Sequence, residues 1–307
     1  MRVAAGVILL TAAVAAAGPK PGSFAVGVLR RDGVVIPFAT FDGKRWSHDW
    51  PGPTGVDKVV VPIDVRSVPS DWWGPTGPLT TWQAWVGTAA PADVHVTQPD
   101  WVKAHCARQV ALRTDYRPAV PPPVVDVEPY PKDGLVVSPP WPIERIDVVP
   151  PNGADAEAIG SSLAAAFNRA ERDTAARFGH PVKTDARETV SPTIESMYGH
   201  GGEPRAYYVE AVRDYEVPAP HECVAIAFGT GWFVREHGSF RSLAMAVDLL
   251  DCDRLGASYI QPFGVVRIGT RLFWLAQFSS RDRERYAVIE PKAKAVDAVV
   301  NAWGGGC

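Results

Sequence analysis

The sequence predicts an α+β protein that is mostly antiparallel β, with two β-rich domains, the second carrying one long amphipathic helix packed on a meander sheet. Three observations lead to this fold class. Short runs of β-branched and aromatic residues recur between Gly, Pro and Asp turn signals. A proline-dense stretch divides the chain near its middle. One segment after that stretch repeats its apolar residues with the period of a helix.

The N-terminus has the pattern of a secretion leader. Met1 and Arg2 give a positive start, residues 3–14 are apolar and uncharged, and Ala15 to Ala17 supply the small residues that a signal peptidase reads. The apolar run is shorter than the roughly 20 residues that a membrane-spanning helix needs. We therefore predict a signal peptide over 1–17 and an exported bacterial protein, secreted or periplasmic, with no transmembrane segment after leader removal.

Residues 18–117 are predicted to form a small β domain, either a sandwich or a barrel. Two strand-like runs, 24–29 and 34–41, flank Asp32-Gly33. Asp-Gly between apolar runs is typical of a hairpin turn, because Gly accepts a positive φ. Many short strands with frequent turns indicate a sandwich or barrel, and further candidates lie at 59–61, 82–86, 94–96 and 109–114.

The range 118–151 contains eleven prolines and is predicted to be a stiff connector between the two domains. Proline fixes φ and supplies no amide donor, so this density argues against a helix and against a central strand. The apolar pieces Leu135 to Val137 and Ile146 to Val149 are expected to lie along a sheet edge.

Residues 152–307 are predicted to be the α+β domain. Ile159, Leu163 and Phe167 lie on one face of a helix over 154–178, which Gly179 ends. Strands are expected after the helix, because β-branched runs return between turn signals; a strand is favoured over a helix for 240–250, whereas 292–302 stays undecided. The expected strands are 205–212, 223–228, 232–235, 263–268, 272–278 and 286–290, with hairpin turns at Gly229–Gly231 and Gly269-Thr270.

The four cysteines, Cys106, Cys223, Cys252 and Cys307, show no C-x-x-C spacing, which argues against a zinc knuckle or a thioredoxin-like motif. In an oxidising compartment an even number indicates disulfides. Of the three connectivities we favour Cys252–Cys307, which would tie the C-terminal tail to a strand, and Cys106–Cys223, which would join the two halves.

The charge distribution argues against nucleic acid as a partner. The net charge is -3, and no basic stripe is present to neutralise phosphates. Arg281, Arg283 and Arg285 alternate with Asp282 and Glu284, which is typical of a solvated turn.

Catalytic signatures such as G-x-S-x-G, H-E-x-x-H and a Walker A loop do not occur in the chain. His200 and Glu203 share a glycine-rich segment and could act as a general base and its orienting carboxylate in a hydrolase. An exposed connector explains the same residues more simply.

Asp251, Asp253 and Gly256 match three positions of a calcium-binding loop, and calcium is the one cofactor that the sequence suggests. Leu255 and Pro262 stand where two further ligands belong. A polar turn after a strand therefore explains the acidic cluster better than a metal site.

Seven of the eleven tryptophans lie in the N-terminal half. Trp72 and Trp73 are adjacent in a Pro/Gly-rich loop, and neighbouring side chains of an extended chain point in opposite directions, so one ring is expected at the surface. Exposed rings bind sugars or peptides, whereas buried ones fill a small core.

Together these patterns favour a non-enzymatic binding or interaction protein that uses its aromatic-rich β domain to bind a glycan or a protein. The alternative is a secreted hydrolase with its site near the His200–Glu203 segment or the Asp251/Asp253 turn.

Overall fold

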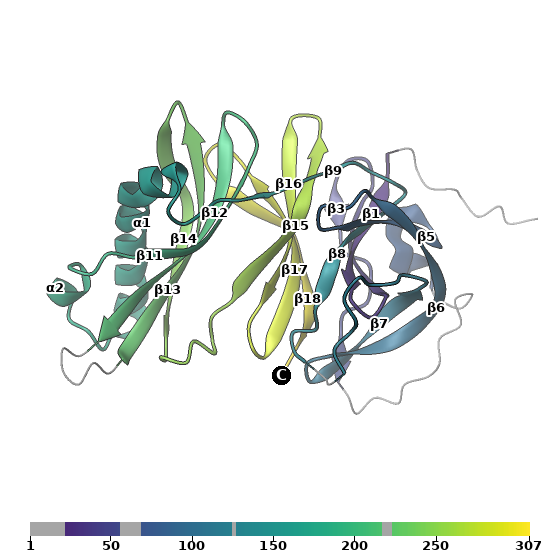
Figure 1. The fold of residues 1–307 in the computed structure, drawn as a ribbon, viewed down its shortest axis with the longest axis horizontal. Helices are drawn as coiled ribbons and strands as arrows, with labels where there is room; N and C mark the ends of the chain where they lie inside the picture. The colour runs from purple at the N-terminus through teal and green to yellow at the C-terminus, as the bar shows by residue number, and fades with distance from the viewer. Residues whose placement is uncertain (1–21, 56–68, 125–126, 217–222) are drawn as a thin grey trace, which may run out of the picture.

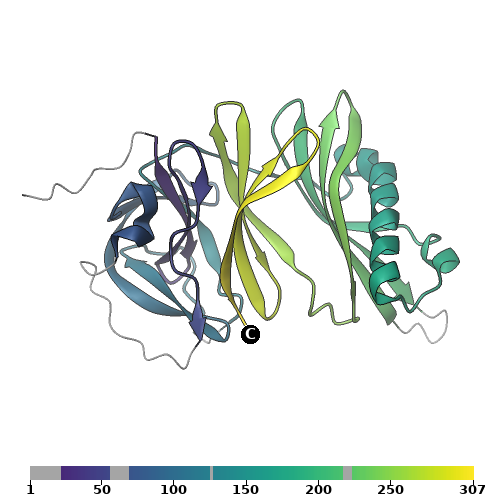
Figure 2. The same ribbon diagram turned by 180° about the vertical axis from the view of Figure 1, so that it is seen from behind.

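The computed structural model describes residues 22–55, 69–124, 127–216 and 223–307. Within them a β-barrel, a middle sheet, a third sheet and a long helix follow one another in a row (Figures 1 and 2). The predicted fold class is confirmed, because the sheets are antiparallel and one long helix packs on one of them. The predicted leader and the strand candidate at 59–61 lie outside the described residues.

The barrel begins with the hairpin of β1 (Phe24–Arg30) and β2 (Val34–Phe41), and Gly33 has the positive φ of 78° that its turn requires. The sheet order is β3-β2-β1-β8-β5-β6-β7-β4, and pairing of β2 with β7 closes six of these strands into a barrel. The other strands of the barrel are β5 (Thr81–Val86), β6 (Ala92–Ala104), β7 (Ala107–Thr114) and β8 (Lys132–Ser138). The short strands β3 (Trp46–Ser47) and β4 (Thr54–Gly55) extend the sheet outside the closed barrel.

Strand β8 corrects the prediction for the proline-dense range. It lies between β1 and β5, so Leu135 to Val137 are interior to the sheet and fully buried, and the edge position predicted for this piece was wrong. The edge position predicted for 146–149 is confirmed, because residues 147–148 form an edge strand of the third sheet. The prolines stop at Pro131 and resume at Pro139, so every residue of β8 keeps an amide donor for its neighbours.

The middle sheet has the order β18-β17-β16-β15-β9 and is buried on both faces over much of its area. Phe273 and Leu275 pack on the barrel, whereas Trp274 and Ala276 pack on the third sheet. The hairpin predicted at Gly269-Thr270 is confirmed, because it joins Tyr259–Ile268 to Arg271–Ser279. The segment 292–302, left undecided between helix and strand, forms a strand from Val296 on. The strands are β9 (Ile143–Glu144), β15 (Tyr259–Ile268), β16 (Arg271–Ser279), β17 (Arg283–Pro291) and β18 (Val296–Gly306).

The third sheet has the order β10-β11-β12-β13-β14, and helix α1 (Ala154–Phe178) covers its outer face with Ile159, Leu163 and Phe167, as predicted. A short helix, α2 (Thr184–Arg187), follows α1. The strand favoured for 240–250 is confirmed as β14. The strands are β10 (Asp147–Val148), β11 (Thr193–His200), β12 (Arg205–Glu216), β13 (Cys223–Glu236) and β14 (Ser239–Leu250).

The hairpin predicted at Gly229–Gly231 was wrong, because β13 runs straight through it. A Cβ atom on Gly229 would lie 2.5 Å from the Phe167 ring of α1, and one on Gly231 would lie 2.5 Å from Met245 Sδ. These glycines therefore allow α1 and its neighbours to approach the strand closely.

A buried ion pair joins the barrel to the middle sheet. Lys132 Nζ of β8 lies 2.9 Å from Glu284 Oε2 of β17, and the two side chains are only 1% and 4% exposed. Tyr286 Oη donates a 2.6 Å hydrogen bond to the same carboxylate. Desolvation lowers the pKa of Lys132 and raises that of Tyr286. Glu284 is therefore the counter-charge of the buried ammonium and the acceptor for the tyrosine, and Lys132 also donates to the Tyr130 carbonyl at 2.8 Å.

The other two interfaces also contain a buried carboxylate. Glu210 of β12 accepts a 2.6 Å hydrogen bond from the Ile260 amide of β15, which ties the third sheet to the middle sheet. Glu171 of α1 lies 2.6 Å from Arg213 Nη1 of β12, which ties the helix to its sheet. Each of these three buried carboxylates thus has a partner in the next layer.

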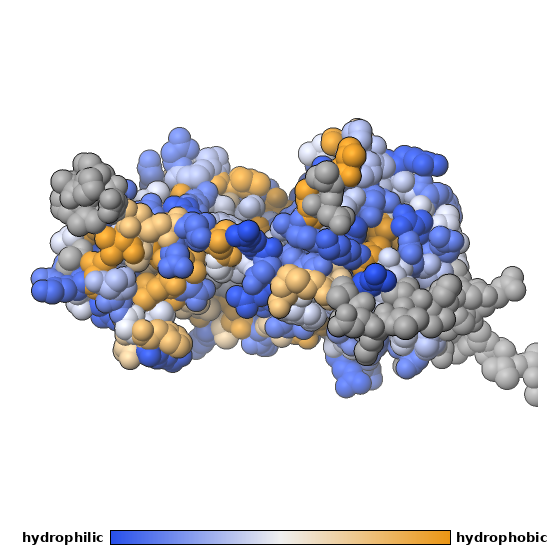
Figure 3. All heavy atoms as spheres, turned by 90° about the horizontal axis from the view of Figure 1, so that it is seen from below, coloured by the Kyte–Doolittle hydropathy of each residue, from blue (hydrophilic) through white to orange (hydrophobic). Residues whose placement is uncertain are grey.

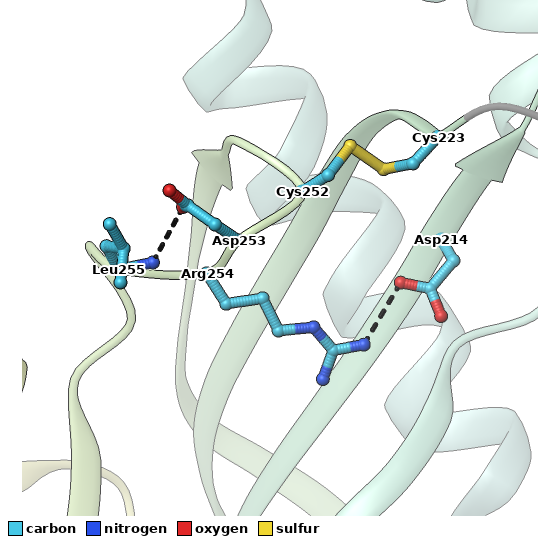
Figure 4. Close-up of a disulfide and its surroundings, with 6 residues drawn as sticks. All are labelled: Asp214, Cys223, Cys252, Asp253, Arg254 and Leu255. Atoms are coloured by element: carbon cyan, nitrogen blue, oxygen red, sulfur yellow. Dashed lines mark hydrogen bonds and ion pairs between the residues drawn. A yellow bond between two sulfur atoms is a disulfide. The ribbon is translucent and has the colours of Figure 1, made fainter.

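The disulfides correct the predicted connectivity. Cys106 is bonded to Cys307 and Cys223 to Cys252, with Cα–Cα distances of 4.8 and 6.0 Å. The β6–β7 turn carries Cys106 and meets the end of β18, because the middle sheet packs on the barrel. Cys223 begins β13 and Cys252 follows β14, so antiparallel pairing brings these two together (Figure 4). No helix in the described ranges is both long and apolar enough to cross a membrane.

Replacing Lys132 by Met should lower the free energy of unfolding by about 3–5 kcal/mol, because it leaves the Glu284 charge buried without its cation. The double variant Lys132→Met/Glu284→Gln should recover part of the loss. Urea denaturation measures both, with exposed Lys44→Met as the control. A loss below about 1 kcal/mol in the single variant would contradict the assigned role.

Removing Cys106–Cys307 by a double serine substitution should cost more stability than removing Cys223–Cys252. The two bonds close segments with sequence separations of 201 and 29. Chain entropy then predicts losses of about 5 and about 3.5 kcal/mol. Denaturant midpoints of the two variants test the order, and an equal or reversed order would count against it.

Candidate functional site

Trp72 and Trp73 lie in a 3-10 turn over Ser70–Thr76, and the structure places both against Trp50. Their ring centroids are 5.8 and 5.1 Å from that of Trp50. Trp73 is only 4% exposed and Trp72 is half-buried. The expectation of opposite directions assumed an extended chain, whereas a helical turn sends both rings to the barrel core. The pair therefore offers little surface to a ligand.

Hydrophobic side chains gather elsewhere on the surface. Seen from below, they form a patch at the end of the molecule that carries α1 and the third sheet, and the centre is mostly hydrophilic (Figure 3). Phe178, at the end of α1, is 81% exposed. This patch lies at the opposite end from the barrel that holds Trp72 and Trp73.

His200 and Glu203 are not brought together. His200 is the last residue of β11 and only 7% exposed, so it does not belong to an exposed loop. Its Nδ1 donates to the Arg145 carbonyl at 2.8 Å, and its Nε2 lies 2.9 Å from Glu144 Oε2. Glu203 instead accepts a hydrogen bond from the His237 amide. The base and its orienting carboxylate are thus engaged with different partners.

Asp251 and Asp253 lie in the turn that follows β14. Asp253 Oδ1 accepts a 3.0 Å hydrogen bond from the Leu255 amide (Figure 4). Arg254 reaches from the same turn to Asp214 of β12, at 3.2 Å. The described residues contain no group of three or more His, Cys, Asp or Glu side chains that could hold a metal ion.

A pocket of 320 Å³ opens between barrel strands β5 and β8 and middle-sheet strands β9 and β15. We call it the Trp85 pocket. Its lining combines two aromatic rings with side chains that donate or accept hydrogen bonds: Trp85, Thr88, Asp133, Arg145, Gln261 and Phe263.

The aromatic part of the Trp85 pocket lies at the rim of the interface between barrel and middle sheet. Trp85 and Phe263 are half-buried and pack against the same hydrophobic cluster. A Cβ on Gly134 would lie 2.0 Å from the Trp85 carbonyl oxygen. Only glycine therefore allows β8 to pass so close to β5 beneath the pocket.

The polar part has one neutralised and one uncompensated charge. The Asp133 carboxylate accepts a 2.8 Å hydrogen bond from Arg31 Nε and a 3.0 Å hydrogen bond from Tyr116 Oη. Burial, and after it the hydrogen bond to Asp133, raises the pKa of Tyr116 to about 12. Arg145 is exposed and donates to the Thr88 carbonyl at 2.8 Å. No carboxylate among the described residues forms an ion pair with Arg145. Within the described part of the chain, the positive charge of Arg145 in this pocket is therefore not neutralised by an ion pair.

Glu144 holds the strand that carries Arg145. Its carboxylate binds Arg267 through Nε and Nη2, the latter at 2.7 Å, and also contacts His200. The Arg267 hydrogen bond is the main reason why the pKa of Glu144 lies below its usual value. This network ties β9 to β15 and β11.

No sequence spacing could have revealed this site, because Trp85, Asp133 and Gln261 come from distant parts of the chain. The concentration of tryptophans in the first half was the available signal, and it covers Trp85 but not Phe263. Comparison with protein-family models found no match, and no curated protein and no solved structure matches the chain.

Glu144→Gln should lower the melting temperature at neutral pH. It should also make the drop in melting temperature between neutral and acidic pH smaller than in the wild type. The folded pKa of Glu144 is lowered from 4.5, so its ion pair stabilises the protein above about that pH, and this contribution is lost as the pH falls through the folded pKa. Melting curves from neutral to strongly acidic pH test this, with exposed Glu157→Gln as the control. If the melting temperatures of the Glu144 variant and the wild type fall by the same amount as the pH is lowered, the assigned role of Glu144 is refuted.

Proposed function

We propose that this chain is an exported, non-enzymatic binding protein whose Trp85 pocket takes a saccharide, preferably one that carries a carboxylate. The observation that carries the proposal is the combination, in one pocket, of two aromatic rings with the guanidinium of Arg145, which forms no ion pair with any described carboxylate. Sugar rings stack on aromatic faces through their C–H groups, and their hydroxyls bond to carboxylates and amides.

The charge of the pocket favours an acidic sugar over a neutral one. Asp133 is paired with Arg31 and adds no net charge, whereas Arg145 has no carboxylate partner among the described residues. Guanidinium groups bind carboxylates with paired, charge-assisted hydrogen bonds. Gln261 and Thr88 are exposed beside it and can bond to sugar hydroxyls.

Export is supported by the two disulfides and by the leader pattern of residues 1–17. Disulfides form and persist mainly in oxidising compartments, and all four cysteines of the chain are paired. A binding function is favoured over hydrolysis because His200 and Glu203, the proposed catalytic pair, are each engaged elsewhere.

Titration with neutral and uronic-acid oligosaccharides should change tryptophan fluorescence, with tighter binding of the acidic series. Trp85→Phe should remove the fluorescence signal. Arg145→Gln should weaken the affinity for acidic ligands by roughly tenfold, and the affinity for neutral ligands should change little. Calorimetry measures the affinities. Arg108→Gln, an exposed change outside the pocket, is the charge-matched control.

The proposal fails if no saccharide binds. It also fails if Arg145→Gln and Arg108→Gln behave alike toward acidic ligands.

A further inference from the structure

A second hollow lies between the middle sheet and the third sheet, away from the Trp85 pocket. Its volume is 290 Å³, and its walls come from β13 and β14 on one side and β17 and β18 on the other. The walls are largely apolar and aromatic, with Trp232 facing from the third sheet and Phe278, Ile289 and Val296 from the middle sheet. We call it the Arg285 cleft.

Arg285 places a positive charge in this otherwise largely apolar cleft. The alternating charges at 281–285 predicted a solvated turn, but β17 already begins at Arg283 and Arg285 is half-buried. Its guanidinium carbon lies 4.3 Å from the centroid of the Phe278 ring, and its Nη1 donates to Asn301 Oδ1 at 3.3 Å. The side chain is therefore held in the cleft by a ring and an amide.

The charge of Arg285 is not compensated within the described residues. None of their carboxylates forms an ion pair with it, in contrast to Arg267 and Arg271, which bind Glu144 and Glu290. The nearby charge of Arg283 is also positive. Desolvation lowers the pKa of Arg285, which is the expected cost of holding a cation among apolar side chains. An anion at this position would remove that cost.

We propose that the Arg285 cleft binds an amphiphile with an anionic head group and a hydrocarbon tail. The head group meets the Arg285 guanidinium, beside the Tyr208 and Thr230 side chains that also line the cleft. The tail lies between the sheets against Trp232, Ile289 and Val296. Two small residues, Ala244 and Ala246, leave the space on the β14 side.

A neighbouring hollow of 320 Å³ lies further along the same pair of sheets. It includes Leu243, which precedes Ala244 in β14, and Leu272 of β16. The apolar side chains of this hollow extend the wall beyond the Arg285 cleft, and the charged side chains of Arg271, Glu290 and Lys292 also line it. This proposal does not depend on the Trp85 pocket, which shares no lining residue with the cleft.

The test compares three probes with the same ten-carbon tail on the full chain: decanoate, decanol and decyltrimethylammonium. Equilibrium dialysis should show decanoate binding more tightly than decanol, and decanol more tightly than the cation. Arg285→Gln should weaken the affinity for decanoate by roughly tenfold or more and leave the affinity for decanol unchanged. Arg285→Lys should keep most of the affinity, and exposed Arg281→Gln is the matched control.

Ala246→Phe fills the cleft from β14 and should abolish binding of decanoate and decanol without altering the melting temperature. Trp85→Phe should leave decanoate binding intact, which separates this site from the saccharide site. Equal affinity for decanoate and decanol in the wild type overturns the proposal, even if an Arg285 variant does not fold. Unchanged decanoate binding in a folded Arg285→Gln variant overturns it as well.

Discussion

The arrangement of the molecule depends on a middle sheet that is buried on both faces. Successive side chains of a strand point to opposite sides, so Phe273 and Leu275 of β16 need one apolar partner while Trp274 and Ala276 need another. The barrel supplies the first partner and the third sheet supplies the second. Removal of either would expose a continuous apolar face to water, at a cost that grows with the exposed area.

Apolar packing alone would tolerate sliding of one layer over the next, and buried polar groups limit that freedom. Glu284, Glu210 and Glu171 each find a partner in a neighbouring layer. A shift of one residue would leave a charge or an amide buried without a partner, which costs more than a well-made contact contributes. The Cys106–Cys307 bond adds a covalent link at the interface of barrel and middle sheet.

Both hollows proposed as binding sites arise where packed sheets part. Sheets twist, so two faces that meet closely at their centre diverge toward their rims. At one rim the divergence leaves Trp85 and Phe263 beside Arg145, and at the other it leaves Trp232 and Phe278 beside Arg285. In each case the lining combines aromatic rings with an arginine that forms no ion pair with a described carboxylate, and this combination is the basis of both proposals.

The sequence alone determined the local elements: the Asp32-Gly33 turn, the helix over 154–178 and the strand-rich, antiparallel character of the chain. These depend on contacts between near neighbours, which turn chemistry and apolar periodicity report directly. Tertiary structure decided the interior place of β8, the disulfide partners, the burial of His200 and the position of Arg285. The physical reason is that one residue type serves several purposes. Glycine permits a positive φ at Gly33 and a close approach of α1 at Gly229, and only the packed neighbours distinguish the two.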